Sequence, residues 1–272
     1  MRLIDSHCHL QSDRFDADRD AVIERARAAG LERILVPGWT EETSRAAIQL
    51  VAQHPWLDAA AGIHPHEAER AGPAEWEAIV RLARDHRVAA VGETGLDYDR
   101  AFSPVPVQRD NLRRHLDLGL DLQKPVIIHC RSAAGSSQAH DDVLELLEAA
   151  GIRATERARH ERPAALIHSF SGTPAFAGEV LARGLAISIS GLAFRAGEEA
   201  TLGEVAGAVP PERLLVETDS PFLSPPGGPR RRNEPAWVAI TAERVAVARG
   251  GTPEALGEAL VAAYDRTVPR PS

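Results

Sequence analysis

The sequence has very few cysteines and no long hydrophobic run. Only two of its 272 residues are cysteine, Cys8 and Cys130, which excludes a disulfide-rich secreted scaffold. No apolar core of a secretory signal follows Met1, so we expect a cytoplasmic protein whose thiols are buried packing residues. No segment approaches the roughly 20 apolar residues of a membrane span, so we expect no contact with a membrane.

An excess of positive charge is also missing. The formal net charge is −8, and Lys124 is the only lysine. This argues against a broad basic surface that coats nucleic acid regardless of sequence, although a local positive patch or bound cations can still attract phosphate. The remaining composition, 44% hydrophobic and 26% charged, is typical of a globular protein.

Short apolar segments recur along the whole chain and predict eight strands. Because they are apolar throughout rather than alternating, they indicate strands buried on both faces, as in a parallel sheet. The predicted strands are Leu3–Ile4, Arg33–Val36, Leu57–Ile63, Val88–Val91, Val126–Ile128, Ala164–Ile167, Leu185–Ile189 and Arg213–Val216.

Between the strands, apolar residues at spacings of three and four predict amphipathic helices. Thr252 followed by Pro253 and Glu254 indicates the start of a terminal helix. The predicted helices include Ala21–Ala29, Thr43–Ala52, Trp76–Ala83, Leu112–Leu120, Val143–Leu147, Trp237–Val247 and Glu254–Tyr264.

Eight strand and helix repeats over about 250 residues predict an α/β fold, a single-domain (β/α)₈ TIM barrel that spans residues 1–272. The alternative is a doubly wound open sheet. Its dinucleotide-binding glycine turn is absent, because the first strand leads directly into Asp5-Ser6-His7-Cys8-His9.

Residues able to bind metal follow the predicted strands. The carboxyl ends of all strands of a barrel face one mouth, so these side chains are expected to form one cluster. In chain order they are Asp5, His7, His9, His64, His66, Glu93, Asp97, His129, His168 and Asp219.

Side-chain alternation refines this set, since residues two apart on an extended segment project to the same side. His7 and His9 can therefore share one ion, whereas Cys8 points away. Imidazoles and carboxylates together suit Zn²⁺ or Mn²⁺, while Mg²⁺ usually prefers oxygen ligands alone. If Glu93 bridges two ions, His7, His9 and Asp219 complete one site, and His129 with His168 the other.

Several polar residues have two readings. Asp5 is a ligand or a partner that orients His9, and Glu217 needs a partner if it lies in the barrel interior. Asp97 can order its own loop, and His64 can contact substrate or fix its loop. Ordinary hydrogen-bonded roles are expected for His66, His86, His115, His140 and His160. Arg131 and the run Arg230–Arg232 can bind phosphate, although an arginine run is more often a solvated surface.

With these residues in place, the sequence resembles the TatD family of metal-dependent hydrolases, a branch of the amidohydrolase-like barrels. The resemblance covers nearly the whole chain and rests on seven motifs in family order. They are Asp5-Ser6-His7-Cys8-His9, Gly62-Ile63-His64-Pro65-His66, Gly92-Glu93-Thr94-Gly95-Leu96-Asp97-Tyr98, Pro125-Val126-Ile127-Ile128-His129, His168-Ser169-Phe170-Ser171-Gly172, Glu217-Thr218-Asp219-Ser220-Pro221 and Arg232-Asn233-Glu234-Pro235.

The resemblance implies that His7, His9 and Asp219 hold one metal, that Glu93 bridges, and that His129 and His168 hold the second metal. It also implies a metal-dependent deoxyribonuclease, commonly a 3′–5′ exonuclease on single-stranded DNA. Some family members act on other esters, including D-aminoacyl-tRNA.

We therefore predict two-metal hydrolysis of phosphodiesters by a bridging hydroxide, with two divalent cations that are Zn²⁺, Mn²⁺ or Mg²⁺. Asp219 and Glu93 are the predicted catalytic residues, and His64 and Arg131 the predicted substrate-binding residues. No obligate protein partner is indicated, and a monomer is expected. The alternatives are an amidohydrolase-type or aminoacyl-ester hydrolase, and a barrel that binds metal or nucleic acid without catalysis.

Overall fold

Eight strands follow one another along the chain and pair in sequence order in one parallel sheet. The computed structural model describes residues 1–229 and 231–270. Each strand is hydrogen-bonded to the next, from β1 with β2 through β7 with β8. The strands are β1 (Leu3–Asp5), β2 (Leu31–Pro37), β3 (Leu57–Ala61), β4 (Val88–Asp97), β5 (Val126–Arg131), β6 (Ala165–Ile167), β7 (Ala186–Ile189) and β8 (Leu214–Val216).

Backbone hydrogen bonds between the continuations of β1 and β8 close the sheet. Ser6 N donates to Val216 O at 3.0 Å, and Asp219 N donates to His7 O at 2.8 Å. A parallel bridge pairs Cys8 with Ser220. The predicted fold class, a (β/α)₈ barrel, is confirmed.

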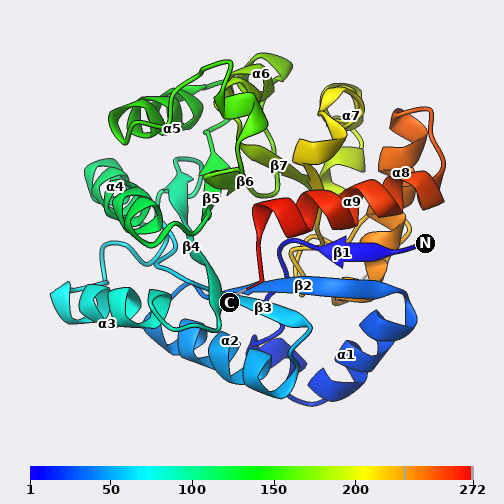
Figure 1. Cartoon of the computed structure of the whole chain (residues 1–272), viewed down its shortest axis with the longest axis horizontal. Coiled ribbons are helices and arrows are strands. Elements are labelled where there is room, and N and C mark those ends of the chain that lie inside the picture. Colours follow the sequence, from blue (N-terminus) through cyan, green and yellow to red (C-terminus); the bar gives the residue numbers. More distant parts are fainter. Residues whose placement is uncertain (230, 271–272) are drawn as a thin grey trace.

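Helices form the outer layer around the strands (Figure 1). They are α1 (Arg19–Ala28), α2 (Glu41–Gln53), α3 (Pro73–Ala83), α4 (Val105–Leu122), α5 (Gln138–Ala149), α6 (Pro174–Ala182), α7 (Glu199–Ala208), α8 (Val238–Ala248) and α9 (Pro253–Thr267). Short 3₁₀ helices cover Asp13–Phe15, Ala158–His160, Gly191–Phe194, Pro211–Arg213 and Pro235–Trp237. None of the helices in the described ranges is both long and apolar enough to cross a membrane.

The amino ends of the strands carry a buried charged network. Arg33 on β2 donates to both carboxylate oxygens of Asp58 on β3, at 2.9 and 2.6 Å. Tyr264 on α9 donates to the same carboxylate at 2.9 Å. Removing one partner of a buried pair costs about 3–5 kcal/mol, because the other charge stays buried alone. This end of the barrel therefore contributes stability, and the opposite end is left for chemistry.

Several elements extend beyond their predicted bounds, among them β4 and α4. β4 continues past Val91 to Asp97, because its pairing with β5 shifts register between Val91 and Thr94 and then resumes. α4 begins at Val105 rather than Leu112. Pro106 is accommodated there because the N–H groups of a first helical turn have no partner within the helix. The capped start of α9 is confirmed, since the Thr252 side chain accepts from Ala255 N at 3.3 Å.

Candidate metal centre

The predicted metal ligands meet at the carboxyl ends of the strands. His7 and His9 follow β1, His168 follows β6 and Asp219 follows β8, whereas Glu93 and His129 lie within β4 and β5. His7, His9, Glu93 and His168 are buried, and the other two are partly exposed. The barrel therefore brings together all six residues expected as ligands.

A close approach between β4 and β5 places two of these side chains. Gly95 on β4 has φ +139°, and a Cβ atom there would collide with the carbonyl oxygen of His129. Only glycine satisfies both conditions. Glu93 lies at the register shift of β4, where its N–H donates to Gly38 O at 2.8 Å instead of to a neighbouring strand.

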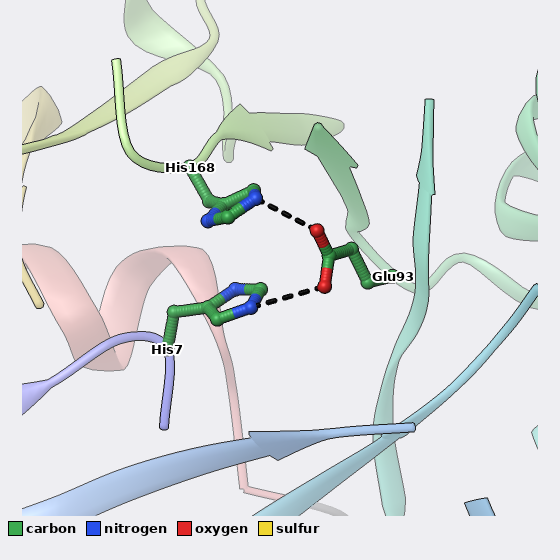
Figure 2. Close-up of side chains that lie close together, drawn as sticks. All are labelled: His7, Glu93 and His168. Atoms are coloured by element: carbon green, nitrogen blue, oxygen red, sulfur yellow. Dashed lines mark ion pairs between the residues drawn. The ribbon is translucent and has the colours of Figure 1, made fainter. Parts of the chain in front are cut away.

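Glu93 lies at the centre of the cluster, with its two carboxylate oxygens directed at different histidines. Oε2 is 3.1 Å from His7 Nε2, and Oε1 is 2.8 Å from His168 Nε2. Figure 2 shows the carboxylate reaching both rings, one with each oxygen. Oε1 also lies 3.3 Å from His129 Nδ1. The carboxylate therefore has one oxygen for each of two groups of ligand atoms.

The first group consists of His7, His9 and Asp219, whose ligand atoms lie within 4.8 Å of one another. Asp219 Oδ1 is 3.3 Å from His9 Nε2 and 3.8 Å from His7 Nε2. The two Nε2 atoms are 3.3 Å apart. Asp219 adopts φ +52°, a conformation that aspartate tolerates better than most residues.

The second group contains His129 and His168. His129 Nδ1 lies 3.1 Å from His168 Nε2, and both face Oε1 of Glu93. The His168 ring also stacks on the His7 ring, with centroids 3.8 Å apart. The stack joins the two groups and fixes their separation.

The donor atoms fit divalent cations. Imidazole nitrogens and carboxylate oxygens are the ligands of Zn²⁺ and Mn²⁺. Nitrogens of two imidazoles at 3.1–3.3 Å require a proton or a cation between them, because two lone pairs at that distance repel. The cluster is therefore capable of binding metal.

The charges of the acids suit this role. Burial raises the pKa of Glu93, but the imidazoles of His168, His64 and His7 outweigh burial and leave the pKa well below its usual range. Burial also raises the pKa of Asp219, and His9 and His7 reverse that effect and lower it. Both side chains are therefore anionic, as cation ligands must be.

Comparison with known proteins identifies the family of this chain. The family model described as TatD related DNase matches residues 4–268. The chain belongs to the TatD family. A relative from Salmonella typhimurium, named 3′-5′ ssDNA/RNA exonuclease TatD, is 35% identical over 270 residues, which are 98% of each chain. The Bacillus subtilis protein named uncharacterized metal-dependent hydrolase YabD is 33% identical over 90% of each chain.

A solved structure shows the same fold. The crystal structure of YJJV, a TatD homologue from Escherichia coli, superposes with a TM-score of 0.84 at 27% identity and covers 98% of both chains. The resemblance of the sequence to the TatD family is thereby confirmed.

In this TatD-family chain, His64 lies beside the second ligand group. Its Nε2 is 3.3 Å from Glu93 Oε1. Burial lowers the pKa of His64 to about 4, although the nearby Glu93 raises it. His64 is thus neutral near pH 7 and faces the cluster rather than only its own loop.

Asp97 and His66 support the same edge of the mouth. Asp97 Oδ1 accepts from the N–H groups of Asp99 and Arg100, which confirms that it orders the loop after β4. Its Oδ2 lies 2.7 Å from His66 Nε2 and 3.4 Å from His129 Nε2. His66 is hydrogen-bonded as predicted, but at the mouth. Its position after β3, two residues from His64, is the signal that places His66 at the mouth.

Two of the arginines predicted to bind phosphate form ion pairs with acidic side chains. Arg131 ends β5 and forms an ion pair with Asp99 at 2.8 Å. Arg232 pairs with Asp18 at 2.7 Å and with Glu234 at 3.0 Å, so it ties the loop after β8 to α1. Arg230 lies outside the described residues. Of the predicted phosphate ligands, Arg131 stays at the rim of the mouth, whereas Arg232 has a structural role.

Two buried acids have clear partners. The prediction that Asp5 binds metal or orients His9 is wrong, because Asp5 accepts from Thr218 N at 3.0 Å and His7 N at 3.2 Å. It joins β1 to the segment after β8, while His9 Nδ1 faces Pro37 O. Glu217 lies in the barrel interior, as expected, and its Oε1 is 3.2 Å from His168 Nδ1. This contact leaves His168 Nε2 directed at Glu93.

The remaining candidates lie away from the chemistry. Cys8 and Cys130 are buried free thiols, and burial raises the pKa of both above the usual value. Lys124, the only lysine, donates to the carbonyls of Ala83 and Asp85 next to the amino end of β5. Lys124 therefore lies at the end of the barrel opposite the cluster.

Proposed function

We propose that this chain is a divalent-metal-dependent nuclease that removes nucleotides from the 3′ end of single-stranded DNA. The observation that carries the proposal is the Glu93 carboxylate, whose two oxygens face two separate groups of ligands. The names of the relatives, 3′-5′ ssDNA/RNA exonuclease and metal-dependent hydrolase, support the same class of reaction.

Two cations fit this arrangement. His7, His9 and Asp219 would hold one of them with Oε2 of Glu93, and His129 and His168 would hold the other with Oε1. The donor set suits Zn²⁺ or Mn²⁺ best, and Mg²⁺ less well. When bound, such cations supply positive charge that stabilises the attacking and leaving oxygens of a displacement at phosphorus.

The protein's own side chains orient water and phosphate. Asp219 is anionic and presents Oδ1 to the cluster, so it can orient the attacking water and accept its proton. Neutral His64 can donate a hydrogen bond to a phosphate oxygen. Arg131, exposed at the end of β5, offers a guanidinium for the phosphate of the bound strand.

The same cluster bears on the number of domains and on the oligomeric state. We propose one domain that acts as a monomer, because every ligand comes from one chain and from one sheet. A cytoplasmic location stays a prediction from the cysteine content.

Metal removal tests the function directly. Purified protein should shorten 5′-labelled single-stranded DNA stepwise from its 3′ end, lose this activity in chelator, and regain it when Mn²⁺ or Zn²⁺ is added back. Gel analysis of the products measures both the polarity and the metal requirement. Single-stranded RNA, an aminoacyl ester and a cyclic amide are assayed in parallel. Turnover of the ester or the amide, with every oligonucleotide left intact, would contradict the proposal.

A further inference from the structure

Two phenylalanines at the mouth of the barrel are exposed, unlike the others of the chain. Phe15, Phe170, Phe176 and Phe194 are buried, whereas Phe102 is 62% exposed and Phe222 is 45% exposed. A single exposed apolar side chain needs no explanation. The positions of Phe102 and Phe222 do need an explanation, because each ring lies against a histidine at the mouth of the barrel.

Phe102 lies beside His66, whose ring centroid is 6.2 Å from that of His129 in the second ligand group. Its ring meets the His66 ring edge to face, with centroids 4.7 Å apart, and His66 in turn lies 4.3 Å from His64. The adjacent Ser103 is buried, donates to His66 O and accepts from Glu69 N. The backbone under the exposed ring is therefore anchored, so the ring has a defined place.

Phe222 lies beside the first ligand group. It follows β8, and its N–H donates to the carbonyl oxygen of Asp219 at 2.9 Å. Its ring centroid is 6.0 Å from that of His9. The exposed Arg14 places its guanidinium carbon 5.5 Å from the Phe222 ring centroid. An aromatic face and a cation are thus paired at this edge.

Left-handed backbone conformations occur beside both rings. Ala101, before Phe102, has φ +47°, and Leu223, after Phe222, has φ +49°. Ser169 and Asp219, also at the mouth, share this conformation. In the described chain, Gln123 at the end of α4 is the one other such residue that is not glycine. Left-handed backbone is uncommon at residues other than glycine, and such residues gather at functional sites.

We propose that Phe102 and Phe222 are stacking platforms for unpaired nucleobases, one for each nucleotide next to the phosphate at the metal centre. This inference rests on the proposed function. The Phe222 ring lies beside His9 of the first group, and the Phe102 ring lies beside His66, which neighbours His129 of the second group. A phosphate at the cluster would therefore have one ring near each group. Aromatic faces stack any base and need no sequence, whereas the bases of a duplex are already stacked on their neighbours. The two rings thereby favour single strands.

The test combines removal of each ring with removal of each base. In Phe102→Ala and Phe222→Ala, KM for a single-stranded oligonucleotide should rise about 10-fold while kcat changes little. For wild-type protein, KM should rise by the same factor when the terminal or penultimate nucleotide of the oligonucleotide is abasic. Each alanine variant should show no further rise in KM on the substrate that lacks the base stacked on the removed ring. Phe102→Trp and Phe222→Trp should restore the wild-type KM, and Phe102→Leu and Phe222→Leu should not.

Leu120→Ala is the matched control, because Leu120 is exposed near the carboxyl end of α4, away from the mouth, and should leave KM unchanged. Mn²⁺ titration should give the same binding in every variant. Unchanged KM in both alanine variants would overturn the inference while the nuclease function stands. The same holds if the rise in KM from removing a ring and the rise from removing a base multiply when both are removed. A wild-type protein that leaves all oligonucleotides intact would instead overturn the proposed function and this inference with it.

Discussion

Replacing Asp219 with asparagine should lower kcat for phosphodiester hydrolysis by roughly 100- to 10,000-fold, the range expected for loss of a general base. The amide has nearly the shape of the carboxylate but cannot accept the proton of the attacking water. Asparagine also tolerates the left-handed backbone of this position, φ +52°, so the fold should stay intact. The rate is measured in single-turnover assays on labelled single-stranded DNA, and folding by thermal unfolding.

Two controls separate this role from loss of metal. Asp117→Asn makes the same chemical change on the exposed side of α4 and should leave the rate at the wild-type value. Asp219→Asn is also assayed at increasing Mn²⁺, because weaker metal binding alone would be overcome at saturation. Near wild-type turnover at saturating Mn²⁺ would exclude Asp219 as the proton acceptor.

Glu93→Gln should have the second large effect, on metal binding itself. One oxygen of the side chain becomes an NH₂ group, which cannot bind a cation, so one of the two ligand groups loses its shared ligand. The negative charge among His7, His64 and His168 is lost as well. Substitution of groups that only orient metal ligands costs about 10- to 100-fold in affinity, so loss of this ligand should cost at least that much.

Calorimetric titration with Mn²⁺ measures this effect without any assay of activity. Wild-type protein should bind two ions, and Glu93→Gln should bind fewer ions and with lower affinity. Glu77→Gln, an exposed glutamate on α3, is the matched control and should bind like wild type. Two Mn²⁺ ions bound by Glu93→Gln with wild-type affinity would show that Glu93 does not bridge.

The barrel and the cluster of candidate metal ligands could be predicted from the sequence because both depend on local signals. Apolar runs mark strands buried on both faces, and polar residues directly after them lie at the same mouth. Alternation pairs His7 with His9 and separates Cys8 from them. The helices α6 and α7 give weaker patterns, because α7 consists largely of small residues that bury little surface.

The surroundings of the ligands could not be predicted, because they depend on contacts between distant segments. Asp5 bonds Thr218 more than 200 positions away, so its role becomes visible only when the barrel closes. The sequence makes Arg232 a candidate phosphate ligand, because its ion pair with Asp18, just before α1, forms only in the folded chain. The exposure of Phe102 and Phe222 likewise depends on the conformation of the segments after β4 and β8, which apolar patterns do not describe.

A crystal structure of the protein grown with Mn²⁺, with anomalous scattering recorded at the manganese edge, tests the central claim most directly. The account predicts two anomalous peaks, one on each side of the Glu93 carboxylate: one among His7, His9 and Asp219, the other beside His129 and His168. A map with no peak between these side chains, or with a single ion that Glu93 does not touch, would contradict it.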